Sequence, residues 1–151
     1  MADWAVRPAV SESSRSLETY PIHLGLGASA VPQPAFTGMD WYADYVARHG
    51  GDGAEGRLVS LHRFAETWTM WEMHPAGAEV VVCIEGAMTL LQEQGDGGET
   101  VRIELSAGGY AINPPGIWHS ADVAGPCAAL FITAGEGTQH KPRDPAPLAA
   151  T

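Results

Sequence analysis

Apolar and polar residues alternate through much of the chain from residue 57 onward, with the two-residue period of β-strands. The clearest example is residues 101–105, which read Val-Arg-Ile-Glu-Leu and would give a strand one buried and one solvated face. We predict strands at residues 58–64, 68–74, 79–85, 87–92, 101–105, 110–113, 119–123 and 127–133, with a hairpin turn at residues 95–98. Short strands in such close succession favour an antiparallel sandwich or barrel, so we predict an all-β fold.

A different spacing marks residues 39–49, where apolar side chains recur at the interval of a helix. The resulting stripe consists of Trp41, Tyr42, Tyr45 and Val46. Gly50 follows and would end the helix, so we predict a domain of residues 36–134 in which one short helix precedes the barrel. Residues 1–35 are predicted to form an N-terminal arm with one possible strand, and residues 135–151, which are rich in proline, an irregular C-terminal tail.

The charge balance narrows the classes of partner. With 18 acidic against 8 basic residues, the net charge is −10, which would repel a nucleic-acid backbone or an anionic membrane. Cys83 and Cys127 lie in apolar runs and are predicted to be buried free thiols rather than a disulfide. The N-terminus lacks a basic stretch followed by an apolar one, and no apolar run approaches transmembrane length. We therefore predict a cytoplasmic protein that binds neither nucleic acid nor membrane.

Candidate ligands for a metal ion gather in two separate segments of the chain. Glu72 and His74 are two positions apart in a predicted strand, so their side chains point the same way. Glu79 begins the next strand after a short turn, and His119 follows a Pro-Pro-Gly turn that can aim it inward. Imidazole and carboxylate groups suit Zn, Fe, Mn or Ni, and two histidines with one carboxylate leave coordination positions open.

The second of these segments resembles the second motif of the cupin superfamily, which reads G-x5-P-x-G-x2-H. Gly108, Pro114, Gly116 and His119 match it without a gap. The resemblance covers roughly residues 57–134. It implies a double-stranded β-helix, or jelly-roll barrel, and a homodimer.

The first segment matches the first cupin motif, H-x-H-x3-4-E-x6-G, with one departure. His74, Glu79 and Gly86 have the expected spacing, whereas Glu72 stands where the first histidine is expected. The resemblance thus implies a metal held by His74, Glu79 and His119. Three interpretations of Glu72 remain open: a fourth metal ligand, a catalytic general base beside the metal, or a solvent-facing residue of a short edge strand.

Three further residues are candidates for the wall of a substrate pocket. Met70 shares the predicted strand face of Glu72, His62 lies on a strand face that can enter the barrel, and Trp118 adjoins a proposed ligand. For His62 the alternative is a hydrogen-bonded core histidine. The remaining histidines, which occur in loops or near ends of elements, are predicted to be solvated: His23, His49 and His140.

Two functions from different classes fit these residues. The first is a small metal-dependent cupin enzyme, of the dioxygenase, isomerase or lyase type, that acts on a small organic molecule. The second is a non-catalytic cupin that binds a small molecule or a sugar. Converging ionisable groups in an apolar barrel favour the enzyme.

Overall fold

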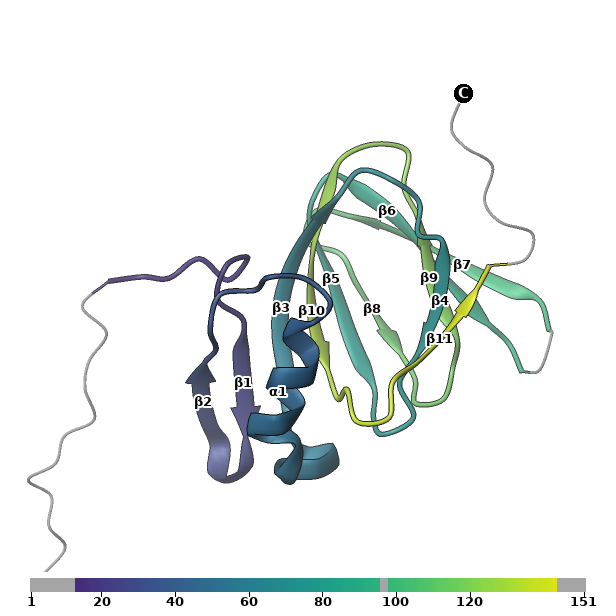
Figure 1. The fold of residues 1–151 in the computed structure, drawn as a ribbon. Coiled ribbons are helices and arrows are strands. Elements are labelled where there is room, and N and C mark those ends of the chain that lie inside the picture. Colours follow the sequence, from purple (N-terminus) through teal and green to yellow (C-terminus); the bar gives the residue numbers. More distant parts are fainter. Residues whose placement is uncertain (1–12, 96–97, 144–151) are drawn as a thin grey trace, which may run out of the picture.

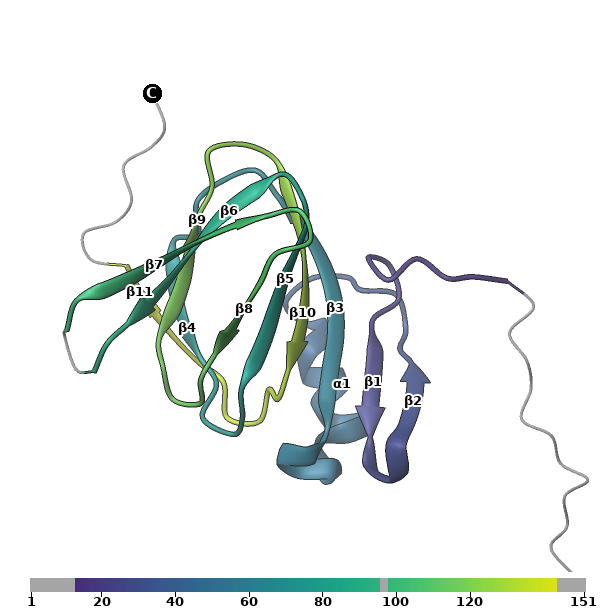
Figure 2. The ribbon, with the colours of Figure 1, turned by 180° about the vertical axis from the view of Figure 1, so that it is seen from behind.

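Two antiparallel sheets face one another in the computed structural model, which describes residues 13–95 and 98–143 (Figures 1 and 2). In spatial order, the first sheet contains β2 (Ser29–Pro32), β1 (Ile22–Gly25), β3 (Arg57–Phe64), β10 (Cys127–Thr133), β5 (Glu79–Glu85) and β8 (Tyr110–Asn113). The second contains β11 (Gln139–Pro142), β4 (Met70–Met73), β9 (His119–Asp122), β6 (Ala87–Glu93) and β7 (Thr100–Ser106). One α-helix, α1 (Trp41–His49), and two short 3-10 turns, η1 (Leu26–Ala28) and η2 (Gly50–Glu55), complete the described elements, so the predicted all-β jelly-roll fold with one short helix is confirmed.

The alternating sequence pattern places the core between the two sheets. In β7, Leu105 is buried whereas Arg102 and Glu104 are exposed, as the pattern of that segment predicts. The core cluster joins inward-facing side chains of both sheets, among them Val81, Cys83, Met88, Leu90, Leu105, Ala111, Ala121, Ala129 and Phe131. Cys83 and Cys127 are buried and free, which confirms their prediction as unpaired thiols.

A glycine at position 86 is required by the turn between β5 and β6. Its φ of +73° lies in the left-handed region, and a Cβ there would collide with the carbonyl oxygen of Pro126. The glycine that closes the first sequence motif therefore serves the barrel itself. The predicted turn at 95–98 lies partly outside the described residues. In the β6–β7 register Glu93 pairs with Thr100, as a hairpin with its turn at these residues requires.

The N-terminal region packs against one side of the barrel (Figure 1). Strands β1 and β2 form a hairpin, and β1 extends the first sheet by pairing with β3. This region thus contains two strands where the sequence predicted one. The helix begins two residues later than predicted and ends at His49, as expected before Gly50.

The C-terminal segment lies on the opposite side of the barrel, where β11 pairs with β4 (Figure 1). The prediction of an irregular tail is therefore wrong for Gln139–Pro142. The segment is polar and forms a sheet edge, so it carries none of the apolar alternation by which strands are recognised in sequence. Pro142 is tolerated because an edge strand leaves some backbone donors unpaired.

The outer face of the first sheet is partly apolar and partly exposed. Ile84, Ile112 and Tyr110 are 39%, 49% and 66% exposed, respectively. Homodimer formation, which could cover this face, stays a prediction. Among the described residues, no helix is long and apolar enough to cross a membrane.

Candidate metal centre

The two segments singled out in the sequence lie side by side. Glu72 in β4 pairs with His119 in β9, and the Gly116 N–H donates to the His74 carbonyl oxygen at 3.0 Å. Gly116 adopts a φ of +76°, which a glycine reaches without strain. The Pro-Pro-Gly turn of one motif is thereby fixed to His74 of the other.

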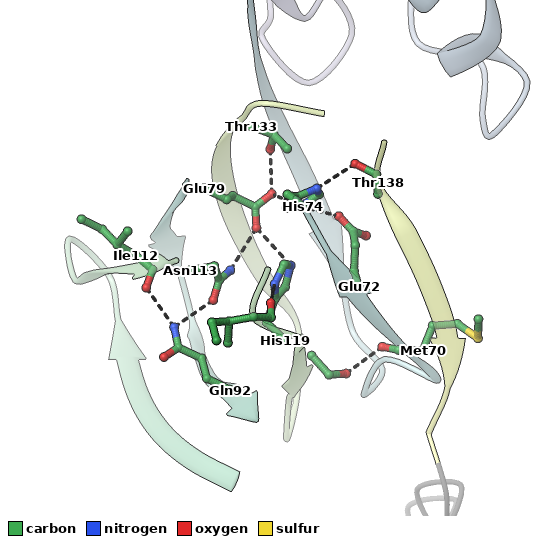
Figure 3. Close-up of polar contacts among 12 residues, drawn as sticks. Met70, Glu72, His74, Glu79, Gln92, Ile112, Asn113, His119, Thr133 and Thr138 are labelled. Carbon is green, nitrogen blue, oxygen red and sulfur yellow. Dashed lines mark hydrogen bonds and ion pairs between the residues drawn. The ribbon is translucent and has the colours of Figure 1, made fainter. Parts of the chain in front are cut away.

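Four ionisable side chains converge inside the barrel, with their nearest ligand atoms all within 4.8 Å of one another (Figure 3). His74 Nε2 lies 2.8 Å from Glu72 Oε1 and 3.1 Å from Glu79 Oε2, and His119 Nε2 lies 3.3 Å from Glu79 Oε1. His74, Glu79 and His119 are buried, whereas the Glu72 side chain is 28% exposed. Glu72 is therefore the member of the set that is most accessible to solvent.

The two histidines each leave one nitrogen without a hydrogen bond. Although carboxylate oxygens lie close by, neither His74 Nε2 nor His119 Nε2 makes a hydrogen bond of acceptable geometry, and both atoms are buried. An unsatisfied buried polar atom costs about 1–3 kcal/mol. Two such atoms facing the same pair of carboxylates form a donor set that fits one divalent metal ion.

The other nitrogen of each histidine is fixed from outside. His119 Nδ1 lies 3.3 Å from the Ile117 carbonyl oxygen, which can only accept. His74 Nδ1 lies 2.8 Å from Thr138 Oγ1, and that hydroxyl donates to the Gly135 carbonyl oxygen at 2.9 Å. Because the hydroxyl hydrogen is already committed, His74 Nδ1–H must donate. Both imidazoles in their neutral form thus keep the Nε2 lone pair for a metal, an arrangement typical of ligating histidines.

Glu79 is held by a chain of neutral donors (Figure 3). Thr133 Oγ1 donates to Glu79 Oε2 at 2.6 Å, and Asn113 Nδ2 donates to Oε1 at 3.0 Å. The Asn113 amide is itself oriented, because Gln92 Nε2 donates to Asn113 Oδ1 at 2.9 Å and also to the Ile112 carbonyl oxygen at 2.9 Å. These contacts leave the carboxylate ionised and fixed in direction.

Charge coupling sets the protonation of the cluster. Burial alone would lower the pKa of His74, but the carboxylates of Glu72 and Glu79 outweigh it and raise the pKa to about 9. Burial would raise the pKa of Glu79, yet the two histidines hold it well below its usual range. Burial also opposes ionisation of Glu72, and the close contact with His74 outweighs it and lowers the pKa. At neutral pH the metal-free cluster therefore holds two carboxylates around a protonated His74, whose Nε2 proton a metal would replace.

Sequence reasoning missed His140 as a neighbour of this cluster. His140 is exposed, at 42%, as predicted, but its Nε2 lies 3.2 Å from Glu72 Oε2. The register of β11 on β4 places His140 directly opposite Glu72. The contact was missed because the tail was predicted to be irregular rather than to form β11.

Sequence reasoning also missed the residues that hold the ligands, namely Gln92, Asn113, Thr133 and Thr138. Strand alternation could have indicated Asn113, which shares a face with Ala111, and Thr133, which shares one with Phe131. Thr138 had no such signal, because it precedes a strand that the sequence does not reveal.

The structure separates the three residues proposed for a pocket wall. His62 is partly buried, with ring centroids 5.1 Å from Phe36 and 5.9 Å from Phe131, so its side chain lies near the interior. Met70 is 38% exposed and lies at the end of β4 away from the cluster (Figure 3). The Trp118 ring lies 4.5 Å from Lys141 Nζ. Lys141 is next to His140 in β11, and His140 faces Glu72. Because adjacent residues of a strand point to opposite faces of the sheet, Trp118 lies on the face away from Glu72.

A second cluster of possible ligands joins the N-terminal hairpin to the helix. It contains His23, His49 and Asp52. The prediction that His23 is solvated is wrong, because this residue is 2% exposed. Tyr45 Oη–H donates to His23 Nδ1 at 2.6 Å, and His23 Nε2–H donates to Asp52 at 2.6 Å, which lowers the pKa of that carboxyl.

The remaining contacts of this second cluster also end on protein. His49 Nε2 accepts from Gln33 Nε2 at 2.8 Å, and Gln33 Oε1 in turn accepts from the Arg48 guanidinium. A Cβ at Gly25 or Gly56 would lie 3.0 Å from the His23 ring, so the imidazole is closely enclosed. We interpret this network as structural, because its histidines are bonded to protein groups and a guanidinium lies beside it.

No protein-family model and no curated protein sequence matches the chain. Among solved structures, one of oxalate oxidase has a TM-score of 0.51 at 18% identity and covers 62% of this chain and 50% of that one. A structure of recombinant oxalate oxidase in complex with glycolate has a TM-score of 0.52 at 16% identity, covering 68% of this chain and 57% of that one.

A cupin-2 domain protein from Shewanella frigidimarina also matches, with a TM-score of 0.43 at 21% identity, over 58% of this chain and 71% of that one. The chain spans about half the length of the first oxalate oxidase structure. At these identities the likeness concerns the fold. The resemblance drawn from the two sequence motifs is confirmed at that level, and the chain is a protein of the cupin fold.

Proposed function

We propose that this chain is a metal-dependent enzyme in which His74, Glu79 and His119 hold one divalent metal ion, either Zn, Fe, Mn or Ni. The observation that carries the proposal is the pair of buried Nε2 atoms without hydrogen bonds, both aimed at the Glu79 carboxylate. The outer contacts to Thr138 and Ile117 support it, since they leave the ligating nitrogen of each histidine free.

A metal bound there would supply a positive charge that polarises an oxygen of the substrate. The chain itself supplies the orientation and the proton chemistry. Glu72 is the member of the set with appreciable exposure, so a substrate entering the barrel meets this carboxylate first. We assign Glu72 as the fourth ligand of the resting site and as the base that takes a proton from a bound substrate.

The substrate class follows from the surroundings of the site. The side chains of the barrel core are largely apolar, and a few polar groups converge beside them, which suits a small organic molecule. The glycolate in one of the oxalate oxidase structures supports the same class of ligand for a barrel of this shape.

Metal analysis of the purified full-length chain tests the proposal. The wild-type protein should carry about one equivalent of metal, and a His74→Ala, His119→Ala double variant should lose it. His49→Ala is the matched control, because it removes an imidazole from the second cluster. Equal metal content in the wild type and the double variant, or metal loss only in the control, would overturn the assignment.

Metal identity then separates the reaction types. Iron(II) would favour oxygen chemistry, whereas zinc or manganese would favour isomerisation or elimination, in which Glu72 moves a proton. A metal-loaded protein that binds small acids tightly and leaves a broad panel of them unchanged would support the non-catalytic binder instead.

A further inference from the structure

A row of aromatic rings leads from the N-terminal region toward the metal centre. Phe36, in the segment before the helix, packs edge-on against Tyr42 with ring centroids 5.6 Å apart. The same ring packs edge-on against His62 of β3 at 5.1 Å, and His62 lies 5.9 Å from Phe131. Elements outside the barrel thus contribute to an aromatic surface that continues inside it.

Two anchors fix the position of this surface. Trp41 Nε1 donates to the Pro34 carbonyl oxygen at 3.0 Å, and the Phe36 N–H donates to the Thr19 carbonyl oxygen at 2.8 Å. Tyr45, on the same stripe of α1 as Tyr42, is bonded to the buried His23. The stripe therefore holds the helix to the hairpin through Tyr45 and meets Phe36 through Tyr42.

Tyr42 brings a hydroxyl group to this surface. Its side chain is partly buried, and its hydroxyl is not among the fully buried polar atoms without a hydrogen bond, so the oxygen is open to solvent or to a ligand. Burial, together with the negative charges of Glu72 and Glu79, raises the pKa of Tyr42 to about 12. The phenol is therefore protonated at physiological pH. The row of rings reaches the site through Phe131, which shares a face of β10 with Thr133, the donor to Glu79 Oε2.

The pKa of His62, whose imidazole packs against Phe36, is also shifted by burial. Burial lowers the pKa of His62, although the charge of Glu72 opposes the shift. At neutral pH the surface beside Glu72 therefore combines one phenolic donor, one neutral imidazole and the Phe36 ring. This combination suits a ligand that has both an acceptor oxygen and a flat apolar body.

We infer that Tyr42 and Phe36 determine substrate specificity at this site, and that the ligand is a small aromatic molecule bearing an oxygen acceptor. Tyr42 Oη–H donates to that oxygen, and Phe36 packs edge-on against the ring. The inference rests on the proposed function, because it places the ligand beside the metal. It goes beyond that function by naming the ligand class and by assigning recognition to residues that precede the barrel.

Binding of 4-nitrocatechol, a coloured aromatic probe, to the zinc-loaded full-length chain tests the inference. Wild type should bind the probe, and Tyr42→Phe should weaken binding about tenfold, as expected for loss of one hydrogen bond to an ionised oxygen. Phe36→Leu should weaken it several-fold through the lost aromatic contact. Tyr110→Phe, at a side chain that is 66% exposed on β8, is the matched control and should leave binding unchanged.

Glycolate, measured by competition against the coloured probe, separates the two contributions. It has acceptor oxygens but no ring, so Tyr42→Phe should weaken its binding while Phe36→Leu should not. Metal affinity, titrated separately, should be the same in the wild type and in the three variants. A substitution that merely destabilised the fold would lower this affinity as well. Circular dichroism checks that each variant folds.

The outcomes distinguish this inference from the proposed function. Absence of stoichiometric metal binding in the wild type would overturn both. Metal uptake with no 4-nitrocatechol binding, or with equal probe affinity in wild type and Tyr42→Phe, would overturn the inference and leave the metal centre standing. If Tyr42→Phe fails to fold, an unchanged affinity in Phe36→Leu would still overturn the role of the aromatic surface.

Discussion

Thr138 Oγ1 lies 2.8 Å from His74 Nδ1, so a residue of the C-terminal segment sets the direction of a proposed metal ligand that directly follows β4. The threonine hydroxyl donates to the Gly135 carbonyl oxygen and must accept from the imidazole. Through this contact the segment after β10 belongs to the candidate site.

Thr138→Val removes the acceptor while preserving the shape of the side chain. We expect metal affinity to fall about tenfold, because neutral His74 is no longer held with its Nε2 lone pair toward the site. Competition with a fluorescent chelator measures the change. Thr138→Ser keeps a hydroxyl and should retain most of the affinity, so equal losses in both variants would contradict the role of this hydrogen bond.

The raised pKa of His74 predicts a pH dependence of the metal-free fold. Because folding raises this pKa from 6.5 to about 9, the group stabilises the fold fully below pH 6.5, and the stabilisation is lost as the pH rises through 9. At about 1.4 kcal/mol per pKa unit, the difference is on the order of 3 kcal/mol. Urea unfolding in EDTA at pH 6, 7.5 and 9.5 measures it.

In His74→Gln this part of the pH dependence should disappear. Metal binding should show the opposite trend in the wild type, strengthening up to about pH 9, because the metal must displace the Nε2 proton. A wild-type affinity that does not change between pH 6.5 and 9 would show that His74 is not a ligand.

The barrel could be predicted from sequence because its strands bury one face and so alternate. Residues 101–105 were recognised in this way. The two motifs were recognised by their resemblance to those of the cupin superfamily, and their glycines at positions 86 and 116 meet backbone constraints. Strand parity also placed Glu72 and His74 on one face, and the structure brings them within 2.8 Å of each other.

Elements stabilised by polar contacts could not be predicted in this way. β11 pairs with β4 through its backbone and carries His140 and Lys141, so no apolar pattern marks it. The burial of His23 depends on Tyr45 and Asp52, which approach it only after the helix and hairpin have packed. Both errors concern long-range pairing of polar residues, which a local pattern does not encode.

Glu72 stands where the usual motif has a histidine, and Glu72→Gln tests its assigned roles. The amide keeps an oxygen donor of the same size but cannot accept a proton. We expect metal affinity to fall about tenfold, since His74, Glu79 and His119 remain. Any metal-dependent activity found by substrate screening should fall by about 10²-fold or more. Unchanged affinity together with unchanged activity would leave Glu72 as a residue without a role at the site.

The network around His23 should govern the stability of the N-terminal region. His23→Ala removes a buried imidazole bonded on both sides and should lower the free energy of unfolding by about 3 kcal/mol. Tyr45→Phe removes one hydroxyl and should cost about 1 kcal/mol. Chemical denaturation measures both, with Tyr110→Phe as an exposed control. Metal uptake equal to wild type in His23→Ala is also expected, and loss of metal would contradict a structural role for this cluster.

Asn113 offers a test of whether Glu79 must be held by neutral donors. Its amide donates to Glu79 Oε1 and is oriented by Gln92, so the carboxylate receives a hydrogen bond without receiving a charge. Asn113→Leu removes that donor and should weaken metal binding about tenfold, because the freed carboxylate can turn away from the two histidines. Asn113→Asp instead places a second carboxylate against Glu79, and this repulsion should destabilise the metal-free protein more than the metal-loaded one. The midpoint of thermal unfolding, measured with and without metal, should therefore separate further in Asn113→Asp than in wild type. An equal separation in the two proteins would show that no cation is bound beside Glu79.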